Sequence, residues 1–188
     1  MDEILGLDYS RDLKMKTSRA ERLYAGAGVG VQSSYTTLLR TLTSLNPQGR
    51  FIDLGSGYGR VGLVVGLLYP EVRFTGYEYV SHRVEASCAS AERAGVAGHV
   101  EFLTQDLSDP NFRIPEAESY YLYDPFTQET YRTVFSRLKE IGREQKITVI
   151  TKDAAIGWFS AAIAGESGWL EPDFHDEGMI AFFRSVPG

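Results

Sequence analysis

A glycine-rich loop follows one short apolar run of the sequence and carries an acidic residue just before it. The letters FIDLGSGYGR span residues 51–60, with Asp53 ahead of glycines at positions 55, 57 and 59. Gly55 and Gly57 would let the backbone turn tightly and approach a ligand where a Cβ atom would collide. A dinucleotide fingerprint needs glycine at position 60, where this chain has Arg60, and a carboxylate so close would repel a pyrophosphate. The loop therefore favours a cationic, amine-bearing ligand that donates hydrogen bonds to Asp53.

Two further carboxylates stand at the ends of the next two apolar runs. Glu78 lies 19 residues after Gly59, a spacing at which a carboxylate can accept hydrogen bonds from both hydroxyls of a ribose. Tyr79 offers an apolar wall for a base, and Asp106 could accept from the exocyclic amino group of adenine. The three positions together suit an amino-acid moiety, a ribose and a purine. S-adenosylmethionine combines all three.

A third feature follows the fourth apolar run, where Asp124, Pro125 and Phe126 are consecutive. A carboxylate beside an aromatic ring suits a cationic or amine nucleophile, through charge and cation–π attraction. The alternative is that Pro125 only turns the chain and Phe126 packs in the core. His175 is a further candidate base, placed by the sequence in a hairpin near the end of the chain.

These residues need a sheet whose strand ends meet at one edge. Apolar runs at 50–55, 72–79, 100–107, 119–126 and 146–153 predict five strands, and amphipathic periods predict helices over 34–45, 59–68, 81–94 and 128–141. Strands that alternate with helices form a mostly parallel sheet covered on both faces. The tail, GWLEPDF and GMIAFFRSV around HDEG, predicts a closing antiparallel hairpin. The predicted fold class is α/β: a Rossmann-like three-layer sandwich with a mostly parallel seven-stranded sheet and a C-terminal antiparallel strand.

Composition narrows the function classes. The 188 residues allow one sizeable core, which argues against a two-domain dehydrogenase. The net charge of −6 disfavours binding to an extended nucleic-acid surface. Residues 11–22 hold five basic and two acidic side chains, so a local contact with nucleic acid is still compatible with the sequence. The single cysteine and three histidines have no zinc-site spacing, so no metal is expected. Without an apolar run of membrane-spanning length or a signal peptide, we expect a cytoplasmic protein with no membrane partner.

The runs FIDLGSGYGRVGLVVG, FTGYEYVSHRVEASCASAERAG, VEFLTQDL and YYLYDPF, in this order, resemble the class I (seven-strand) S-adenosylmethionine-dependent methyltransferases. The resemblance covers about residues 34–186. Within that superfamily, D-L-G-S-G-x-G-R together with G-Y-E is most similar to a branch containing seven-strand protein-lysine methyltransferases. The resemblance implies an enzyme, a methyltransferase, with S-adenosyl-L-methionine as cofactor and S-adenosyl-L-homocysteine as product.

The resemblance also implies roles for single residues. Asp53 and the loop residues Gly55, Ser56 and Gly57 would hold the methionine part of the cofactor. Glu78 would bind the ribose hydroxyls. The adenine would lie between the Tyr79 ring, the Asp106 carboxylate and the Leu107 backbone. Asp124 would line the reactive end as the catalytic residue, with Phe126 and Tyr24 as substrate contacts.

The acceptor is the open part of this prediction. Relatives that methylate adenine or glutamine amides carry a D/N-P-P-Y/F tetrapeptide, and this chain lacks one proline of it, which speaks against a base or amide acceptor. We expect an amine nitrogen, with a protein lysine as one candidate. The alternatives are a small-molecule or RNA methyltransferase and a non-catalytic nucleoside-binding module. Residues 1–33 would form an N-terminal extension or lid, and residues 34–188 the methyltransferase domain.

Overall fold

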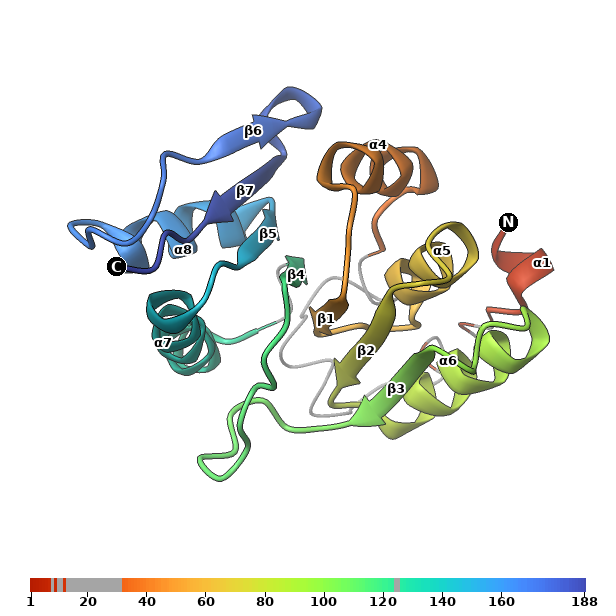
Figure 1. The fold of residues 1–188 in the computed structure, drawn as a ribbon. Helices are drawn as coiled ribbons and strands as arrows, with labels where there is room; N and C mark the ends of the chain where they lie inside the picture. Colours follow the sequence, from red (N-terminus) through yellow and green to blue (C-terminus); the bar gives the residue numbers. More distant parts are fainter. Residues whose placement is uncertain (8, 10–11, 13–31, 124–125) are drawn as a thin grey trace.

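The computed structural model describes residues 1–7, 9, 12, 32–123 and 126–188, and within them seven strands form one sheet (Figure 1). The strands are β1 (Arg50–Leu54), β2 (Arg73–Glu78), β3 (Val100–Thr104), β4 (Ser119–Tyr123), β5 (Thr148–Lys152), β6 (Asp173–His175) and β7 (Ile180–Arg184). Their order across the sheet is β3-β2-β1-β4-β5-β7-β6. Successive strands are therefore added on one side of β1 up to β3 and on the other side from β4 onward. The switch point between β1 and β4 is where ligands bind in doubly wound sheets.

Strands β1 to β5 pair in parallel, and β7 runs antiparallel between β5 and β6. This confirms the predicted fold class, including the closing hairpin. Parallel pairing brings the carboxyl ends of β1, β2, β3, β4 and β5 to one edge of the sheet, called here the carboxyl edge. The acidic residues singled out in the sequence follow these ends, so the topology positions them together.

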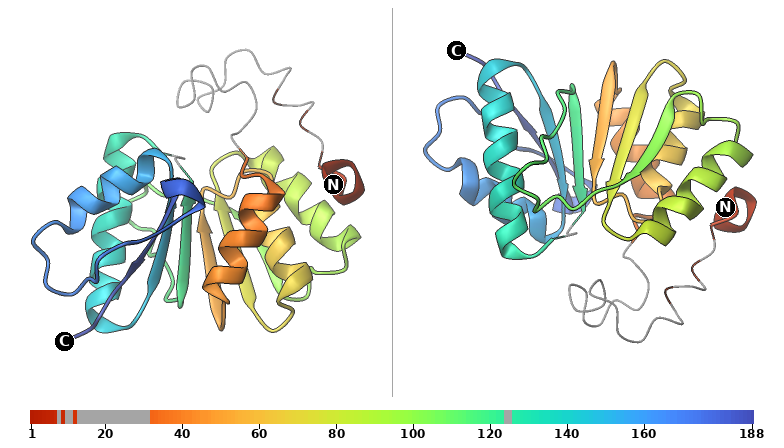
Figure 2. Two further views of the ribbon diagram at one scale, coloured as in Figure 1. Left: turned by 90° about the horizontal axis from the view of Figure 1, so that it is seen from above. Right: turned by 90° about the horizontal axis from the view of Figure 1, so that it is seen from below.

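Helices cover both faces of the sheet, as the views along its edges show (Figure 2). The helices are α1 (Asp2–Leu5), α4 (Tyr35–Leu45), α5 (Arg60–Leu68), α6 (Ser81–Arg93), α7 (Gln128–Glu144) and α8 (Ala154–Ile163). One buried cluster joins the sheet to α4, α5 and α6 through Leu38, Leu63 and Phe74, and we call this side the α5 face. A second joins it to α7 and α8 through Val134 and Phe159.

Helix α4 shows how local sequence sets an element's limits. The Ser34 hydroxyl accepts a hydrogen bond from the Thr37 N–H at 3.1 Å, which caps the first turn. Asn46 adopts a left-handed conformation (φ 49°) at the other end, directly before Pro47. Both limits agree with the sequence prediction.

Several elements differ from the prediction, and three of the differences have a bearing on the site or the core. Strand β3 stops at Thr104 rather than at 107, because the Asp106 side chain accepts from the Ser108 N–H at 2.9 Å and turns the chain. Strand β4 is described only to Tyr123, three residues short of the predicted end. Helix α8 was not predicted, since its sequence AAIGWFSAAI is apolar nearly all round and gives no amphipathic period. Its alanines are nonetheless strong helix formers.

Candidate cofactor-binding site

The glycine-rich loop leaves β1 at the carboxyl edge and turns into α5. Gly55, Gly57 and Gly59 all have positive φ, at 97°, 54° and 76°. A Cβ atom on Gly59 would lie 2.6 Å from the Phe102 ring, so both backbone and space require glycine there. The N–H groups of Gly55 and Ser56 both donate to the Tyr77 carbonyl at 2.9 Å, which ties the loop to the end of β2.

Asp53 lies under this loop on β1 and is only 2% exposed. Among the residues the structure describes, none donates a hydrogen bond to its carboxylate. Burial raises the pKa of Asp53 well above its usual range, and the nearby charge of Glu78 raises it further. A cationic amine beside this carboxylate would offset both effects, because it supplies the missing donor and the opposite charge. The role of Asp53 toward the methionine part of a cofactor stays a prediction, and its burial gives that prediction a physical reason.

Glu78, the last residue of β2, is held by backbone donors on both oxygens. Its Oε2 accepts from the Gly57 N–H and its Oε1 from the Val80 N–H, each at 2.9 Å. The Arg83 guanidinium lies 3.8 Å from Oε1. The carboxylate is thus fixed in place, and each oxygen keeps lone pairs that could accept from ribose hydroxyls.

The end of β3 supplies the predicted adenine side of the site. The Gln105 N–H donates to the Glu78 carbonyl at 2.9 Å, which sets this turn beside β2. Asp106 uses Oδ1 for the Ser108 N–H and hydroxyl, at 2.9 and 2.5 Å. The Oδ2 atom of Asp106 makes no such contact with the described residues. Tyr79 is 39% exposed beside this turn, and Leu107 is buried in the core on the side of α7.

Residues of the N-terminal segment contact the first turns of α5 and α6, through side chains that the sequence pattern does not indicate. Arg60, the residue that replaces the third fingerprint glycine, donates to Asp2 Oδ2 at 2.5 Å, to the Tyr9 hydroxyl at 3.1 Å and to the Ser33 carbonyl at 2.8 Å. The Tyr9 ring lies edge-on to the Tyr58 ring at 4.6 Å. These contacts join positions more than 25 residues apart, so no local spacing could have indicated them.

Asp12 makes a second contact between the N-terminal segment and a helix, in addition to that of Asp2 with Arg60. Its carboxylate contacts His82 Nε2 at 2.6 Å and Arg83 Nη2 at 2.8 Å. Because Arg83 also faces Glu78, Asp12 is linked through one guanidinium to the predicted ribose carboxylate. His82 is therefore partly buried and paired.

The predicted acceptor residues are only partly placed. Asp124 and Tyr24 lie outside the described residues. Phe126 is half-buried, and its ring lies edge-on to the Tyr131 ring at 5.1 Å, so it packs against the α7 side of the core. His175 is on β6, the outermost strand, beside Asp173 at 3.1 Å, and so stands several strands away from β1 and β4. Strand register sets His175 level with Ile180 and Lys152, two strands beyond β5 and apart from Asp53 and Glu78.

Two kinds of site find no support in the described part of the chain. No group of three or more His, Cys, Asp or Glu side chains there has a metal-binding arrangement. No helix in the same residues is long and apolar enough to cross a membrane.

Comparisons with known proteins agree with the geometry. The methyltransferase small domain family matches residues 23–114. A ribosomal RNA small subunit methyltransferase G of Rhizorhabdus wittichii is 43% identical over 58 residues, which are 31% of this chain and 27% of that enzyme. The match thus spans about a quarter of the length of the curated relative.

Solved structures extend the likeness over nearly the whole chain. An RNA methyltransferase from Salinibacter ruber, in complex with S-adenosyl-L-homocysteine, is 25% identical and covers 84% of this chain and 94% of its own, with a TM-score of 0.59. The O-methyltransferase TomG from Streptomyces achromogenes, in complex with S-adenosylmethionine, has the same fold at 18% identity, covering 100% and 91% with a TM-score of 0.60. With its strand order and its carboxylates at successive strand ends, the chain has the fold of the class I S-adenosylmethionine-dependent methyltransferases and is similar to them in sequence over residues 23–114.

Proposed function

We propose that this chain methylates an amino nitrogen of an RNA nucleotide, because its likeness to RNA methyltransferases outweighs the proline that is missing from the adenine- and amide-binding tetrapeptide. The observation that carries the acceptor is the likeness to the Salinibacter RNA methyltransferase, which extends over 94% of that protein and leaves little of it unmatched. The ribosomal RNA methyltransferase relative supports the same acceptor class over a shorter segment. A net charge of −6 implies that the contact with RNA is local.

When bound, S-adenosylmethionine supplies a methyl group on a cationic sulfur. The chain's own residues bind and orient it: Asp53 accepts from its amine, the backbone of Gly55, Ser56 and Gly57 approaches the methionine part, and Glu78 accepts from the ribose. Tyr79, Asp106 and the Leu107 backbone contact the adenine. Each of these roles is a proposal that rests on the placement of the residue at the carboxyl edge and on the sequence motif.

The nature of the acceptor decides whether the protein must move a proton before transfer. The exocyclic amino group of a nucleobase is neutral at pH 7 and can react as it stands. A lysine side chain is an ammonium at that pH and must lose a proton first. We propose that Asp124 lines the acceptor side in either case, with Phe126 and Tyr24 as further contacts, and that residues 1–33 act as a cover over residues 34–188.

A protein lysine is the second candidate acceptor. It is favoured by the sequence of Asp124 and Phe126, a carboxylate two residues from an aromatic ring, which would attract a cationic side chain. It is also favoured by the motif resemblance to protein-lysine methyltransferases.

Label transfer tests the proposal. The purified chain is incubated with methyl-labelled S-adenosylmethionine and host lysate, which is then separated into RNA, protein and small molecules. We expect label in RNA. We also expect the Glu78→Ala variant to bind the cofactor at least about 100-fold more weakly by titration calorimetry, because hydrogen bonds to a charged group are worth about 1.5–3 kcal/mol each. Unchanged affinity would overturn the ribose assignment, and label confined to protein would favour the lysine candidate.

Glu101→Ala is the matched control for Glu78→Ala. Glu101 is also a strand glutamate, but it is exposed and hydrogen-bonds only the Thr75 hydroxyl. Cofactor affinity is expected to stay at the wild-type value. If the wild type binds the cofactor but labels no fraction, the chain is a nucleoside-binding module without catalysis.

A further inference from the structure

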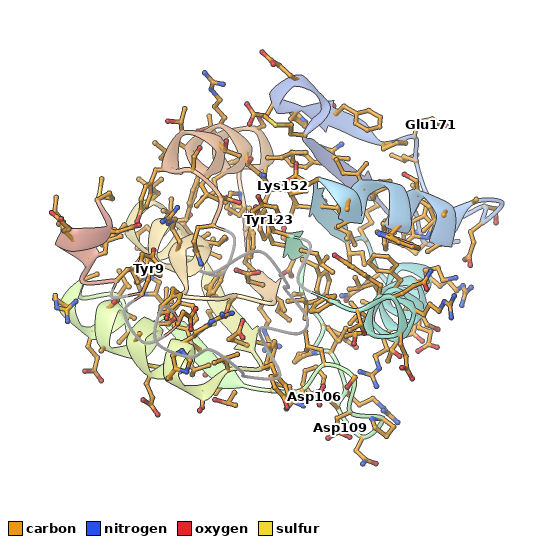
Figure 3. The ribbon with its side chains drawn as sticks, turned by 180° about the vertical axis from the view of Figure 1, so that it is seen from behind. Tyr9, Asp106, Asp109, Tyr123, Lys152 and Glu171 are labelled. Atoms are coloured by element: carbon orange, nitrogen blue, oxygen red, sulfur yellow. The ribbon has the colours of Figure 1, made fainter. Side chains whose placement is uncertain are left out.

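A buried lysine stands at the carboxyl edge and has no part in the cofactor roles above. Lys152 is the last residue of β5 and its side chain is only 9% exposed. The Nζ atom lies 3.8 Å from the centroid of the Tyr123 ring and 2.8 Å from Asp153 Oδ2. Tyr123 and Lys152 are paired in the β4–β5 register, so the contact is built into the sheet. Figure 3 shows the two side chains together at the ends of these strands.

Strand register places this lysine beside the cofactor residues. Asp53 on β1 is paired with Tyr121 on β4, and Tyr123 is two residues further along the same strand. Residues two apart point to the same face of a sheet. Tyr121 packs on the α5 face, and Tyr123 packs against the same cluster, so Lys152 stands on that face too. It therefore lies across β4 from Asp53, on the same face of the sheet.

The charge of Lys152 is preserved despite its burial. Burial lowers the pKa of Lys152, but the hydrogen bonds with Asp153 and Tyr123 raise it, and the net direction is upward. An ammonium with a raised pKa is protonated at neutral pH and cannot serve as a base. It can hold an anion, because it has three N–H donors and Asp153 takes one of them.

Asp153 holds its carboxylate against this ammonium in an unusual conformation. Its backbone has φ 53° and ψ −124°, a region that residues other than glycine rarely occupy. The Asp153 N–H donates to the Met179 carbonyl at 3.0 Å, and its side chain makes no cap for α8. Backbone conformations of this kind persist where the surrounding structure enforces them, and they cluster at functional sites.

Among the described residues, three arginines near this edge pair with carboxylates outside the β4–β5 pair. Arg60 and Arg83 bind Asp2 and Asp12, and Arg40 is an exposed partner of Asp176. The Lys152 charge would repel an incoming cationic side chain, because water screens charges only weakly around a side chain that is this buried. An incoming phosphate would gain a charge-assisted hydrogen bond there.

We propose that Lys152 is an acceptor-binding residue that contacts a phosphate of the RNA next to the methylated nucleotide, with the Tyr123 ring and Asp153 holding the ammonium in place. The inference rests on the proposed function, since it names how the proposed acceptor is recognised. It also opposes the lysine candidate, because the same cation repels an ammonium.

The test compares four variants on the RNA fraction of the host, with methyl-labelled S-adenosylmethionine as donor. Lys152→Gln and Lys152→Met remove the charge, and Lys152→Arg keeps it. Lys146→Gln is the matched control, because Lys146 is exposed and lies just before β5 at the opposite edge of the sheet. Thermal melts and cofactor titration accompany each variant.

We expect either neutral variant that folds to raise KM for RNA about tenfold with kcat little changed and cofactor affinity unchanged. The slope of log kcat/KM against log salt should become shallower by about one. Lys152→Arg should retain most of the wild-type activity, and Lys146→Gln should match the wild type.

Several results would overturn the inference while leaving the proposed methyl transfer intact. One is an unchanged KM and salt slope in both neutral variants. Another is a loss of cofactor affinity equal to the loss of activity, which would assign Lys152 to the cofactor. A third is wild-type label in protein and none in RNA. Absence of label in every fraction would instead refute the proposed function itself.

Discussion

At the scale of single residues, the site depends on carboxylates that the fold places under unequal constraints. Glu78 has its oxygens fixed by the N–H groups of Gly57 and Val80, so it is organised before any ligand binds. Asp53 is buried without a donor among the described residues, so a cationic ligand beside it would stabilise its charged form. One carboxylate gives a rigid attachment point, and the other supplies a driving force.

The Asp53→Asn variant should make the fold more stable while it weakens cofactor binding. In an unfolded chain the Asp53 carboxyl ionises near pH 4, but its pKa in the fold is well above that value. Stability contributed by this carboxyl is therefore fully present below about pH 4 and is lost as pH rises through the folded pKa. An asparagine cannot ionise, so the variant should gain at least about 1 kcal/mol over the wild type at pH 7.

Denaturant unfolding at pH 5 and pH 8, without cofactor, measures this difference. The gap between variant and wild type should widen from the lower to the higher pH. Calorimetry should show cofactor affinity falling at least about tenfold, because a neutral amide attracts an amine less than a carboxylate does. A gap that stays constant with pH would show that Asp53 ionises normally in the fold.

At the scale of elements, the guanidinium of Arg83 on α6 connects the N-terminal segment to the predicted cofactor site. Asp12 holds Arg83 at 2.8 Å, and Arg83 lies 3.8 Å from Glu78. Burial raises the pKa of Asp12, but hydrogen bonds from Arg83 and His82 lower it and prevail, so the pair stabilises the fold above the unfolded pKa and is lost as pH falls through the folded value.

The Asp12→Ala variant should raise the dissociation constant of S-adenosylmethionine about tenfold, or about 1.4 kcal/mol. Without Asp12, the Arg83 guanidinium is expected to move onto the Glu78 oxygens that would otherwise accept from the ribose. Calorimetry measures the constant, and Glu3→Ala is the control, because Glu3 is an exposed acid of the same N-terminal region. Equal affinity in Asp12→Ala and wild type would mean that the N-terminal residues act only on stability.

The elements also show which parts of the site a sequence can predict. Asp53, Glu78 and Asp106 follow apolar runs of a parallel sheet, and parallel strands end at one edge, so their meeting follows from the pattern alone. The pairing of Tyr123 with Lys152 depends on strand register, and those of Asp12 with Arg83 and Asp2 with Arg60 depend on tertiary contacts. No local pattern encodes such contacts, so these residues escaped prediction, as did the apolar helix α8.

At the scale of the whole molecule, one face of the sheet holds the predicted cofactor residues and the other holds a packed core. Asp53 and Glu78 belong to the side of α5 and α6, whereas the cluster under α7 and α8 is an aromatic core. Phe159 is fully buried there, with ring centroids 4.9 Å from Phe135 and from Phe183. We infer that this core chiefly stabilises the fold.

The Phe159→Ala variant tests that division. Truncating a buried phenylalanine costs about 3–5 kcal/mol, so the denaturation midpoint should fall sharply. Cofactor affinity, measured at a temperature where the variant is still folded, should stay within about threefold of the wild type. A parallel loss of affinity would show that both faces jointly shape the cofactor site.

The register that pairs Asp53 with Tyr121 and Tyr123 with Lys152 has a consequence for the size of the acceptor. Asp53 and Lys152 are two strands apart and offset by two residues along the strands, so spacings of about 4.8 Å between strands and about 3.3 Å per residue separate their Cα atoms by about 12 Å. In the proposed roles, Asp53 holds the amine of the cofactor and Lys152 holds a phosphate of the acceptor. The sheet would then set the distance between cofactor and phosphate, and it would select acceptors whose reactive nitrogen reaches the methyl group from that phosphate.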